Sequence, residues 1–451
     1  MKKLIATCLL AGAAQSLFAV PVVSDVEMKQ VLPDRTVTIR YKLADAPAVI
    51  TLDIETNATD GTWASVGGEN IQFVSGAVNR KVTDDDKDEN GFCTIKWRAD
   101  DSWPNRIIGN KGARAVVTAW PLDNTPDYMV VDISASAKPG TARYYTSTNF
   151  LPGTVANPLY KTTSILMRKI LAKDVVWTMG SVGENGRNKN GREDAHEAQL
   201  TNNYYIGVYE VTQSQWALIQ KERPNPSWFQ YEGGKAMRPV ERVCINEIRY
   251  AANSSNAADD YEEWPKPPYK GSFLDLLREK TGIDFDLPSA AEWEYACRAG
   301  NGEGLWGNGS AMLSRQICDN LSKFERYVGS VPENSSLDTT GNDKLSKSDT
   351  VTDTTRGTAI VGSYSPNSWG LYDMHCNVLE WVLDWSTDDT TLLASLRGAV
   401  NTTSSGHRIT KGGSWSTAWC QNARSAAISP QGSTYQYMCI GFRLACRAGL
   451  K

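Results

Sequence analysis

The sequence has few of the residues and motifs that mark most metal and nucleotide enzymes. It contains only three histidines, His196, His375 and His407, and each stands alone in the chain. No Cys-x-x-Cys pair occurs, which argues against a zinc ribbon or a thioredoxin-type redox motif. No P-loop, Gly-x-Ser-x-Gly or His-Glu-x-x-His segment occurs either. Nucleotide-binding, serine-hydrolase and zincin functions therefore have no support.

A strong net charge is also absent. The chain has 47 Lys and Arg residues against 51 Asp and Glu residues, a formal net charge of -4. So small an imbalance gives no general attraction to nucleic acid or to an anionic membrane. No apolar run is long enough to cross a bilayer. We therefore expect no nucleic-acid partner and no membrane span.

The first residues have the pattern of a targeting segment. Lys2 and Lys3 precede an apolar stretch at 4–14, and Ala19 offers a small residue for cleavage. The alternative, a buried N-terminal helix, is less consistent with this order of features. We predict that residues 1–19 are a signal peptide and that the protein is secreted or periplasmic.

Eight cysteines remain after residue 19, and their number is even. In an oxidising compartment this predicts disulfides, although their pairing cannot be read from the sequence. The eight are Cys93, Cys244, Cys297, Cys318, Cys376, Cys420, Cys439 and Cys446.

A chain of 451 residues is too long for one ordinary core, so two or three domains are expected. Residues 20–134 alternate apolar and polar side chains in short runs such as 37–41 and 93–97. Turn clusters separate these runs, a pattern typical of a small immunoglobulin- or fibronectin-like β-sandwich. The acidic run at 84–91 suits either a calcium loop or a solvated hairpin tip, and its spacing favours the tip.

The pattern changes after a linker at 135–161, which begins with small and polar residues and contains Pro and Gly. From residue 162 to 451 the elements are short and the loops, such as 222–238 and 323–358, are long. Capping boxes at Thr212–Gln215 and Ser289–Glu292 predict two helix starts. A third helix is expected between Ser272 and Gly282. The second domain is therefore predicted to be α+β, with few short helices.

The second domain also carries a series of distinctive motifs in a fixed order. They include Trp-Thr-Met-Gly-Ser at 177–181, Tyr-Ile-Gly-Val-Tyr-Glu-Val-Thr-Gln at 205–213, Leu-Pro-Ser-Ala-Ala-Glu-Trp-Glu-Tyr at 287–295, Pro-Asn-Ser-Trp-Gly-Leu-Tyr-Asp-Met at 366–374, Lys-Gly-Gly-Ser-Trp at 411–415 and Gly-Phe-Arg-Leu at 441–444. Over residues 162–448 these motifs resemble the formylglycine-generating-enzyme, or sulfatase-modifying-factor, domain family.

The resemblance implies a fold distantly like that of C-type lectins. It also implies a chemistry, because enzymes of this family use O₂ to oxidise a sulfatase cysteine within Cys-x-Pro-x-Arg to formylglycine. They hold copper through two cysteine thiolates, which are ligands that soft Cu(I) prefers. A sulfatase, or another exported protein or peptide, is then the implied partner.

The copper ligands are only partly matched in this chain. Ser414 stands at the family's active-site serine, but Thr417 stands where the first copper cysteine is expected. The second copper position falls on Asn422, or on Cys420 if two residues are deleted from the loop. Cys420 and Ser414 are thus the catalytic candidates, with at most one thiolate of the pair. Alternatively, Cys420 and Cys439 form disulfides or are simply buried.

The family's calcium sites are matched more fully. Oxygen ligands with one or two carboxylates are what Ca²⁺ takes. The resemblance assigns one site to Asp373, Cys376, Val378 and Glu380, and the other to Asn320, Leu321, Asp353 and Thr355; Cys376, Val378, Leu321 and Thr355 contribute carbonyls. Caps or salt bridges are the alternative roles of these acids.

Three functions follow as hypotheses. The first is a calcium-braced scaffold that binds a peptide, protein or glycan through aromatic residues of the C-terminal loop, namely Trp415, Trp419, Tyr435 and Tyr437. Core packing is the alternative role of each of these aromatic residues and explains it at least as often. The second is a divergent formylglycine-generating oxidase, which uses copper. The third, an iron oxidoreductase, is disfavoured by the isolated histidines. Because one copper thiolate is missing, the sequence favours the scaffold.

Overall fold

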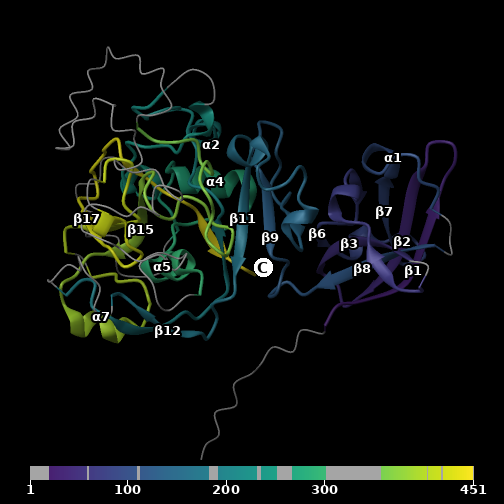
Figure 1. The fold of residues 1–451 in the computed structure, drawn as a ribbon, viewed down its shortest axis with the longest axis horizontal. Coiled ribbons are helices and arrows are strands. Elements are labelled where there is room, and N and C mark those ends of the chain that lie inside the picture. The colour runs from purple at the N-terminus through teal and green to yellow at the C-terminus, as the bar shows by residue number, and fades with distance from the viewer. Residues whose placement is uncertain are drawn as a thin grey trace, which may run out of the picture.

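The computed structural model describes the chain as a β-sandwich followed by a larger α+β part (Figure 1). The described residues are 20–449 apart from 58–59, 109–111, 182–190, 231–234, 251–266, 301–356, 404 and 418–419. The expected signal peptide at 1–19 lies outside them. Within these ranges, no helix has the length and apolarity that a bilayer crossing requires.

The sandwich consists of two sheets whose strands alternate buried and exposed residues. In β2, Val37, Ile39, Tyr41 and Leu43 are buried while their neighbours are not, as the period of two predicts. One sheet has the order β1 (Val22–Gln30), β2 (Thr36–Ala44), β7 (Phe92–Arg98) and β5 (Val74–Gly76). The other has the order β4 (Trp63–Ser65), β3 (Ala48–Asn57) and β6 (Arg80–Val82), with β8 (Ala113–Trp120) also paired to β3.

The acidic run of the sandwich is held by basic side chains. Asp86 pairs with Arg80 at 2.5 Å, and Asp84 pairs with Lys87 at 2.5 Å. Ion pairs of this kind agree with a solvated turn rather than with a calcium loop.

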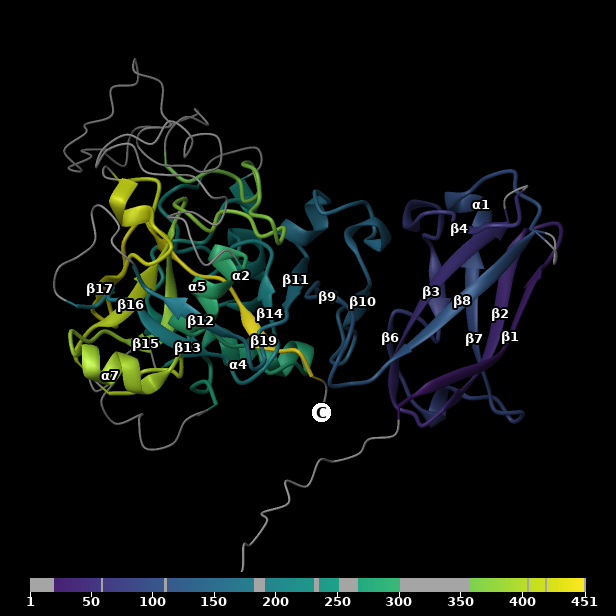
Figure 2. The same cartoon turned by 60° about the horizontal axis from the view of Figure 1, so that its bottom comes forward.

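The boundary between the two parts lies earlier than the sequence pattern placed it. Strand β9 (Tyr128–Asp132) falls within the range 20–134 predicted for the sandwich, but it pairs with β11 (Ser164–Ile170) in the five-stranded sheet β10-β9-β11-β14-β19. Strand β10 (Arg143–Tyr145) lies within the expected linker and pairs with β9. Alternation reveals which face of a strand is buried but not which sheet the strand joins. Figure 2 shows β9 and β10 beside the larger part of the molecule.

The larger part has short strands and short helices, and its longest described helices have nine residues. Besides the strands above, it contains β14 (Tyr204–Gly207), β19 (Ala445–Arg447), a ribbon of β12 (Val176–Met179) and β13 (His196–Gln199), and a sheet of order β17 (Ser429–Gln431), β16 (Arg408–Lys411), β15 (Leu379–Trp385) and β18 (Ile440–Gly441). In its described ranges, the α-helices are α2 (Gln213–Ile219), α3 (Ile245–Ile248), α4 (Phe273–Thr281), α5 (Ala290–Arg298) and α7 (Thr390–Leu396). This is the α+β fold with few short helices that the sequence predicted.

Both predicted capping boxes are confirmed. The Gln215 amide donates to the Thr212 hydroxyl, and the Thr212 amide donates to the Gln215 side chain at 3.0 Å. The Ser289–Glu292 pair caps α5 in the same reciprocal way. These bonds satisfy amides that the first helical turn leaves without partners.

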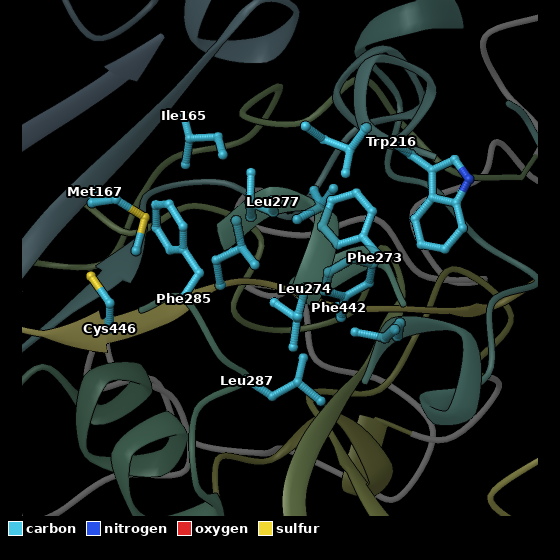
Figure 3. Close-up of a cluster of buried hydrophobic side chains, with 14 of the residues drawn as sticks. Ile165, Met167, Trp216, Phe273, Leu274, Leu277, Phe285, Leu287, Phe442 and Cys446 are labelled. Atoms are coloured by element: carbon cyan, nitrogen blue, oxygen red, sulfur yellow. The ribbon is translucent and has the colours of Figure 1, made fainter. Parts of the chain in front are cut away.

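Aromatic residues fill the core beneath these helices. The rings of Trp216, on α2, and Phe273, on α4, are stacked with centroids 4.8 Å apart. Phe442 meets both rings edge-on. Figure 3 shows this cluster together with Leu274 and Leu277, from the same face of α4. The core fixes α4 and α2 against the segment that leads from β18 to β19.

Candidate functional site

Two glycines shape the loop that carries Ser414. Gly412 and Gly413 have φ values of 92° and 77°, a region that side chains rarely adopt. A Cβ on Gly413 would lie 3.0 Å from the Cα of Ala423, and one on Gly412 would lie 3.0 Å from the Trp293 ring. The glycines thus let the loop pack closely on its neighbours, and Ser414 is buried as a result.

Hydroxyl groups surround Ser414. Its Oγ lies 3.1 Å from the Ser416 Oγ and 3.5 Å from the Thr417 Oγ1. The Ser414 amide donates to the Thr417 Oγ1 at 2.8 Å, and the Thr417 amide donates back to the Ser414 carbonyl at 2.9 Å. The Thr417 hydroxyl therefore closes the turn that holds Ser414.

A thiol that the sequence did not assign to the site completes this group. Cys439 is buried, and the hydroxyls of Ser416 and Ser414 lie close enough to its thiol to lower its pKa. Burial raises the pKa of its thiol to about 11, an effect that these hydroxyls partly offset. Cys439 precedes β18, far along the chain from Ser414, and no spacing rule points to it. We refer to Ser414, Ser416, Thr417 and Cys439 as the hydroxyl–thiol cluster.

The other catalytic candidate, Cys420, begins a short 3₁₀ helix at Cys420–Ala423. Its side chain, like residues 418–419, lies outside the described part, so its catalytic role stays a prediction. The described cysteines are all free thiols: Cys93, Cys244, Cys297, Cys376, Cys439 and Cys446. Disulfides that involve the remaining cysteines are not tested by these residues.

Two of the four aromatic residues expected to bind a ligand are exposed. Tyr435 and Tyr437 are 43% and 39% exposed, and their rings are stacked 5.9 Å apart. Trp415 is instead buried, where it packs edge-on against Phe229 and donates its Nε1–H to the Met438 carbonyl. Trp419 lies outside the described residues. The tyrosines are thus the exposed aromatic surface of this loop.

A buried carboxyl group lies behind the cluster. Glu241 accepts a hydrogen bond from the Phe229 amide through one oxygen, while its other oxygen has no hydrogen-bond partner. Burial raises the pKa of Glu241 to about 8. Its electrostatic interaction with Cys439 raises the pKa of that thiol further. This acid is therefore largely protonated near neutral pH.

The first calcium site assigned by the resemblance lies in a strained loop. Asp373, Cys376 and Asn377 have φ values of 55°, 68° and 56°, in the left-handed region that favours glycine. Cys376 stands where the resemblance has a glycine, and the left-handed backbone explains that preference. The Cys376 amide donates to the Gly412 carbonyl, so this loop supports the Ser414 loop directly.

The two carboxylates of that site differ in what they can still bind. Asp373 accepts from the Gly362 amide through Oδ2, but its buried Oδ1 has no hydrogen-bond partner. Burial raises the pKa of Asp373 to about 6. Both oxygens of Glu380 accept from Arg443, and Trp293 donates to one of them at 2.6 Å. Asp373 therefore has the open oxygen, whereas Glu380 is already saturated by donors.

A third buried acid, Glu210, lies in the same region and was missed by the sequence analysis. It accepts from the Asn377 side chain at 2.6 Å and from the Val378 amide at 3.2 Å. Burial, with Asp373 and Glu380 nearby, raises its pKa well above the ordinary value. Glu210 lies inside a recognised motif, but nothing in the motif distinguishes a buried acid from an exposed one.

The negative charge of this region is suited to a hard cation. Three buried carboxyl groups interact electrostatically with the Arg443 guanidinium, of which Glu380 forms an ion pair with it, and one Asp373 oxygen has no hydrogen-bond partner. Among the described residues, however, no group of three or more His, Cys, Asp or Glu side chains is arranged to hold a metal. Calcium at Asp373, Cys376, Val378 and Glu380 stays a prediction, with carbonyls supplying the further ligands. Asn320, Leu321, Asp353 and Thr355, of the second site, lie outside the described residues.

A buried cysteine–histidine contact beneath the Ser414 loop does not have the geometry of a catalytic pair. The Cys297 Sγ lies 3.4 Å from the His375 Nε2 and 3.8 Å from its Nδ1. Such similar distances place the sulfur beside the ring rather than along the lone pair of Nε2. The thiol contacts the Ser425 Oγ at 3.4 Å, and the His375 Nδ1 bonds the Ala423 carbonyl. Burial raises the pKa of Cys297 to about 12, which keeps it a neutral packing residue.

Comparisons with known proteins bear on this arrangement. The sulfatase-modifying factor enzyme 1-like domain matches residues 167–448. The chaperone protein LppX of Paenibacillus barcinonensis is 27% identical over 245 residues, which cover 51% of this chain and 76% of that protein. The formylglycine-generating enzyme of Mus musculus is 32% identical over 178 residues, and that of Thermomonospora curvata is 31% identical over 184. Each of these two matches covers 39% of this chain, and they cover 42% and 53% of the enzymes, about half of their length.

Two solved structures are also similar. Treponema denticola variable protein 1 is 23% identical with a TM-score of 0.43, and the match covers 63% of this chain and 96% of that chain. PvdO from Pseudomonas aeruginosa is 20% identical with a TM-score of 0.44, and the match covers 62% and 94%.

Proposed function

The chain belongs to the sulfatase-modifying factor enzyme 1-like domain family, and from this premise we propose that it is an exported, calcium-braced binding scaffold without copper-oxidase chemistry. Its ligand is a protein, a peptide or a glycan. The exposed Tyr435 and Tyr437, beside the hydroxyl–thiol cluster, form the binding surface.

One observation carries the proposal: Thr417 occupies the position of the first copper cysteine. It stands where the resemblance expects the first copper thiolate, and its hydroxyl is engaged with the Ser414 amide. A hydroxyl does not replace a soft anionic ligand of Cu(I). Cys439, the described thiol in contact with Ser414, has a raised pKa and is therefore protonated near neutral pH. A pair of thiolates is thus not supplied by the described residues around Ser414.

Two further points support a binding role. The exposed tyrosine pair offers a large and rigid amphipathic surface, which is common at binding interfaces. One relative is named a chaperone protein, and a polypeptide ligand agrees with that name. The family's formylglycine-generating enzymes keep a sulfatase among the candidate partners.

Copper binding and turnover test the scaffold. The purified full chain is reconstituted with Cu(I), and its copper content is compared with that of a Thr417→Cys variant. Oxygen uptake and formyl product are then measured with a Cys-x-Pro-x-Arg peptide. We expect no stoichiometric copper and no formyl product from the wild-type chain. Retained copper together with formylglycine formation would refute the scaffold.

The contact between Cys439 and Ser414 favours a second candidate, the divergent formylglycine-generating oxidase. In that case Cys439, the residue just before β18, contributes a thiol to the site in place of a cysteine from the Ser414 loop. Cys439→Ser and Cys420→Ser should then each abolish turnover. A Cys297→Ser variant, altered in a thiol outside the site, is the matched control and should keep it.

A further inference from the structure

Four residues form a surface patch next to the hydroxyl–thiol cluster, and we call Tyr435, Tyr437, Trp228 and Arg242 the tyrosine–arginine patch. The Arg242 amide donates to the Tyr437 carbonyl at 3.1 Å, which joins the two segments. The Arg242 guanidinium lies over the Trp228 ring, 5.5 Å from its centroid. The tyrosines are exposed, whereas Trp228 and Arg242 are partly buried. The patch thus combines flat aromatic surface with a positive charge.

Arg242 has two unusual properties. Its φ is 59°, a left-handed conformation that costs a residue with a side chain about 1 kcal/mol or more. The conformation is held on both sides, because the amide bonds Tyr437 and the carbonyl accepts from Arg223 at 3.3 Å. Among the described residues, no Asp or Glu forms an ion pair with Arg242, whereas the neighbouring Arg223 is paired with Glu247. Within the described part of the chain, the partly buried guanidinium therefore has no ion-paired carboxylate, and the acid that it interacts with electrostatically is the buried Glu241.

We propose that the tyrosine–arginine patch binds an extended segment of a partner polypeptide that carries an acidic side chain. The proposal rests on the proposed scaffold function and names its ligand class. Tyr, Trp and Arg are the residues that dominate the energetics of protein–protein contacts. The guanidinium donates paired N–H hydrogen bonds to a carboxylate of the ligand, and the tyrosine rings cover the adjacent apolar or proline residue.

The charge of the patch also sets this ligand apart from the peptide that the family resemblance implies. A Cys-x-Pro-x-Arg segment brings a second guanidinium, which Arg242 repels. An acidic segment brings the opposite charge, so electrostatic complementarity favours it. Binding should consequently weaken as salt is raised, because the charged groups are partly exposed.

The test uses the full chain and arrays of dodecapeptides with random flanks. Their fixed centres are Asp-Pro-Asp, Ser-Pro-Ser, Lys-Pro-Lys or Cys-x-Pro-x-Arg, and maltohexaose and chitohexaose are the glycan probes. We expect the Asp-Pro-Asp set to bind at least about tenfold better than the Lys-Pro-Lys set. Arg242→Gln and the double change Tyr435→Ser with Tyr437→Ser should each weaken that binding about tenfold.

Matched controls come from exposed residues elsewhere. Arg98 lies over the exposed Phe73 ring in the sandwich, and Tyr269 is 56% exposed. Arg98→Gln and Tyr269→Ser should leave peptide binding unchanged, and thermal unfolding should show that all variants remain folded. Preference for the Lys-Pro-Lys set, binding of glycans alone, no binding to any probe, or equal loss in the controls would overturn the acidic-segment proposal. Preference for Cys-x-Pro-x-Arg with formyl product would overturn the scaffold as well.

Discussion

Cys439 and Ser414 lie in contact although 25 positions separate them along the chain. The strand β18 brings the cysteine to the loop, because Ile440 pairs with Leu379 beside the segment that supports Ser414. The contact places a thiol in the hydroxyl–thiol cluster from a direction that the family motifs do not indicate. The protonation state of the Cys439 thiol then determines the chemical reactivity of the cluster.

The raised pKa of Cys439 predicts a slow reaction with alkylating agents. At pH 8 an ordinary thiol is partly ionised, whereas burial holds the pKa of Cys439 at about 11 and keeps it protonated. Iodoacetamide labelling, mapped by mass spectrometry, should be at least about tenfold slower at Cys439 than in the urea-unfolded chain. The labelling rate should rise toward pH 11. Rapid labelling at pH 7 would contradict the protonated thiol.

Asp373 predicts a pH dependence of stability in EDTA. Its pKa is about 6 in the folded chain and near 3.8 when unfolded, a difference equivalent to about 3 kcal/mol. Between these two values the unfolded chain loses its proton while the folded chain keeps it, so the free energy of unfolding falls as pH rises. The contribution is fully present below pH 4 and lost above pH 6.

Asp373→Asn removes this titration and leaves an oxygen for the Gly362 amide. The variant should therefore gain stability relative to wild type as pH rises from 4 to 7, measured by urea unfolding in EDTA. A difference that does not change with pH would show that Asp373 is ionised throughout, as it would be beside a retained cation.

In the presence of calcium, the wild type should be stabilised relative to the Asp373→Asn variant, the opposite of the result in EDTA near neutral pH. A bound cation would neutralise the buried carboxylates and stabilise the folded chain by mass action. Millimolar calcium chloride is expected to raise the melting temperature of the wild type but not that of Asp373→Asn. Magnesium chloride at the same concentration is the control, because Mg²⁺ fits such irregular oxygen sites poorly. Equal melting temperatures with calcium and with EDTA would argue against the calcium brace.

A pair of glycines tests the packing of the Ser414 loop. Gly413 and Gly406 both have positive φ, at 77° and 81°, but only the Cβ added at Gly413 meets other atoms, at 3.0 Å. Gly406→Ala should cost about 1 kcal/mol, the backbone cost alone. Gly413→Ala should cost about 1–3 kcal/mol more, because Ala423 must shift. Equal free energies of unfolding for the two variants would mean that the loop relaxes freely.

Local features could be predicted from the sequence because their causes are local. The capping boxes at Thr212 and Ser289 and the alternation that buries Val37 and Ile39 depend on neighbouring residues alone. The family's motif order likewise identified the fold of the larger part. The exposure of Tyr435 and Tyr437 agrees with a binding role, whereas the burial of Trp415 agrees with the alternative of core packing, and the sequence did not distinguish between the two roles.

Features that depend on contacts between distant segments could not be predicted. Strand β9 has the same alternation whether it joins the sandwich or the central sheet, and its partner β11 decides. Cys439 and Glu210 gain their roles from burial beside residues far away in the chain. The left-handed backbone of Arg242 has no signature in a residue type that rarely adopts it.

The strand β9 follows the last strand of the sandwich after only the short stretch 121–127, and Tyr144 is bonded to Asn79 within the sandwich itself. The sandwich is consequently joined to the larger part by a short connection and by a backbone hydrogen bond, and not by a long flexible linker (Figure 1). Expressing the larger part alone from residue 135 would remove β9 from its sheet and leave β10 without the strand that it pairs with. A fragment that begins at residue 121 keeps all five strands of the sheet β10-β9-β11-β14-β19.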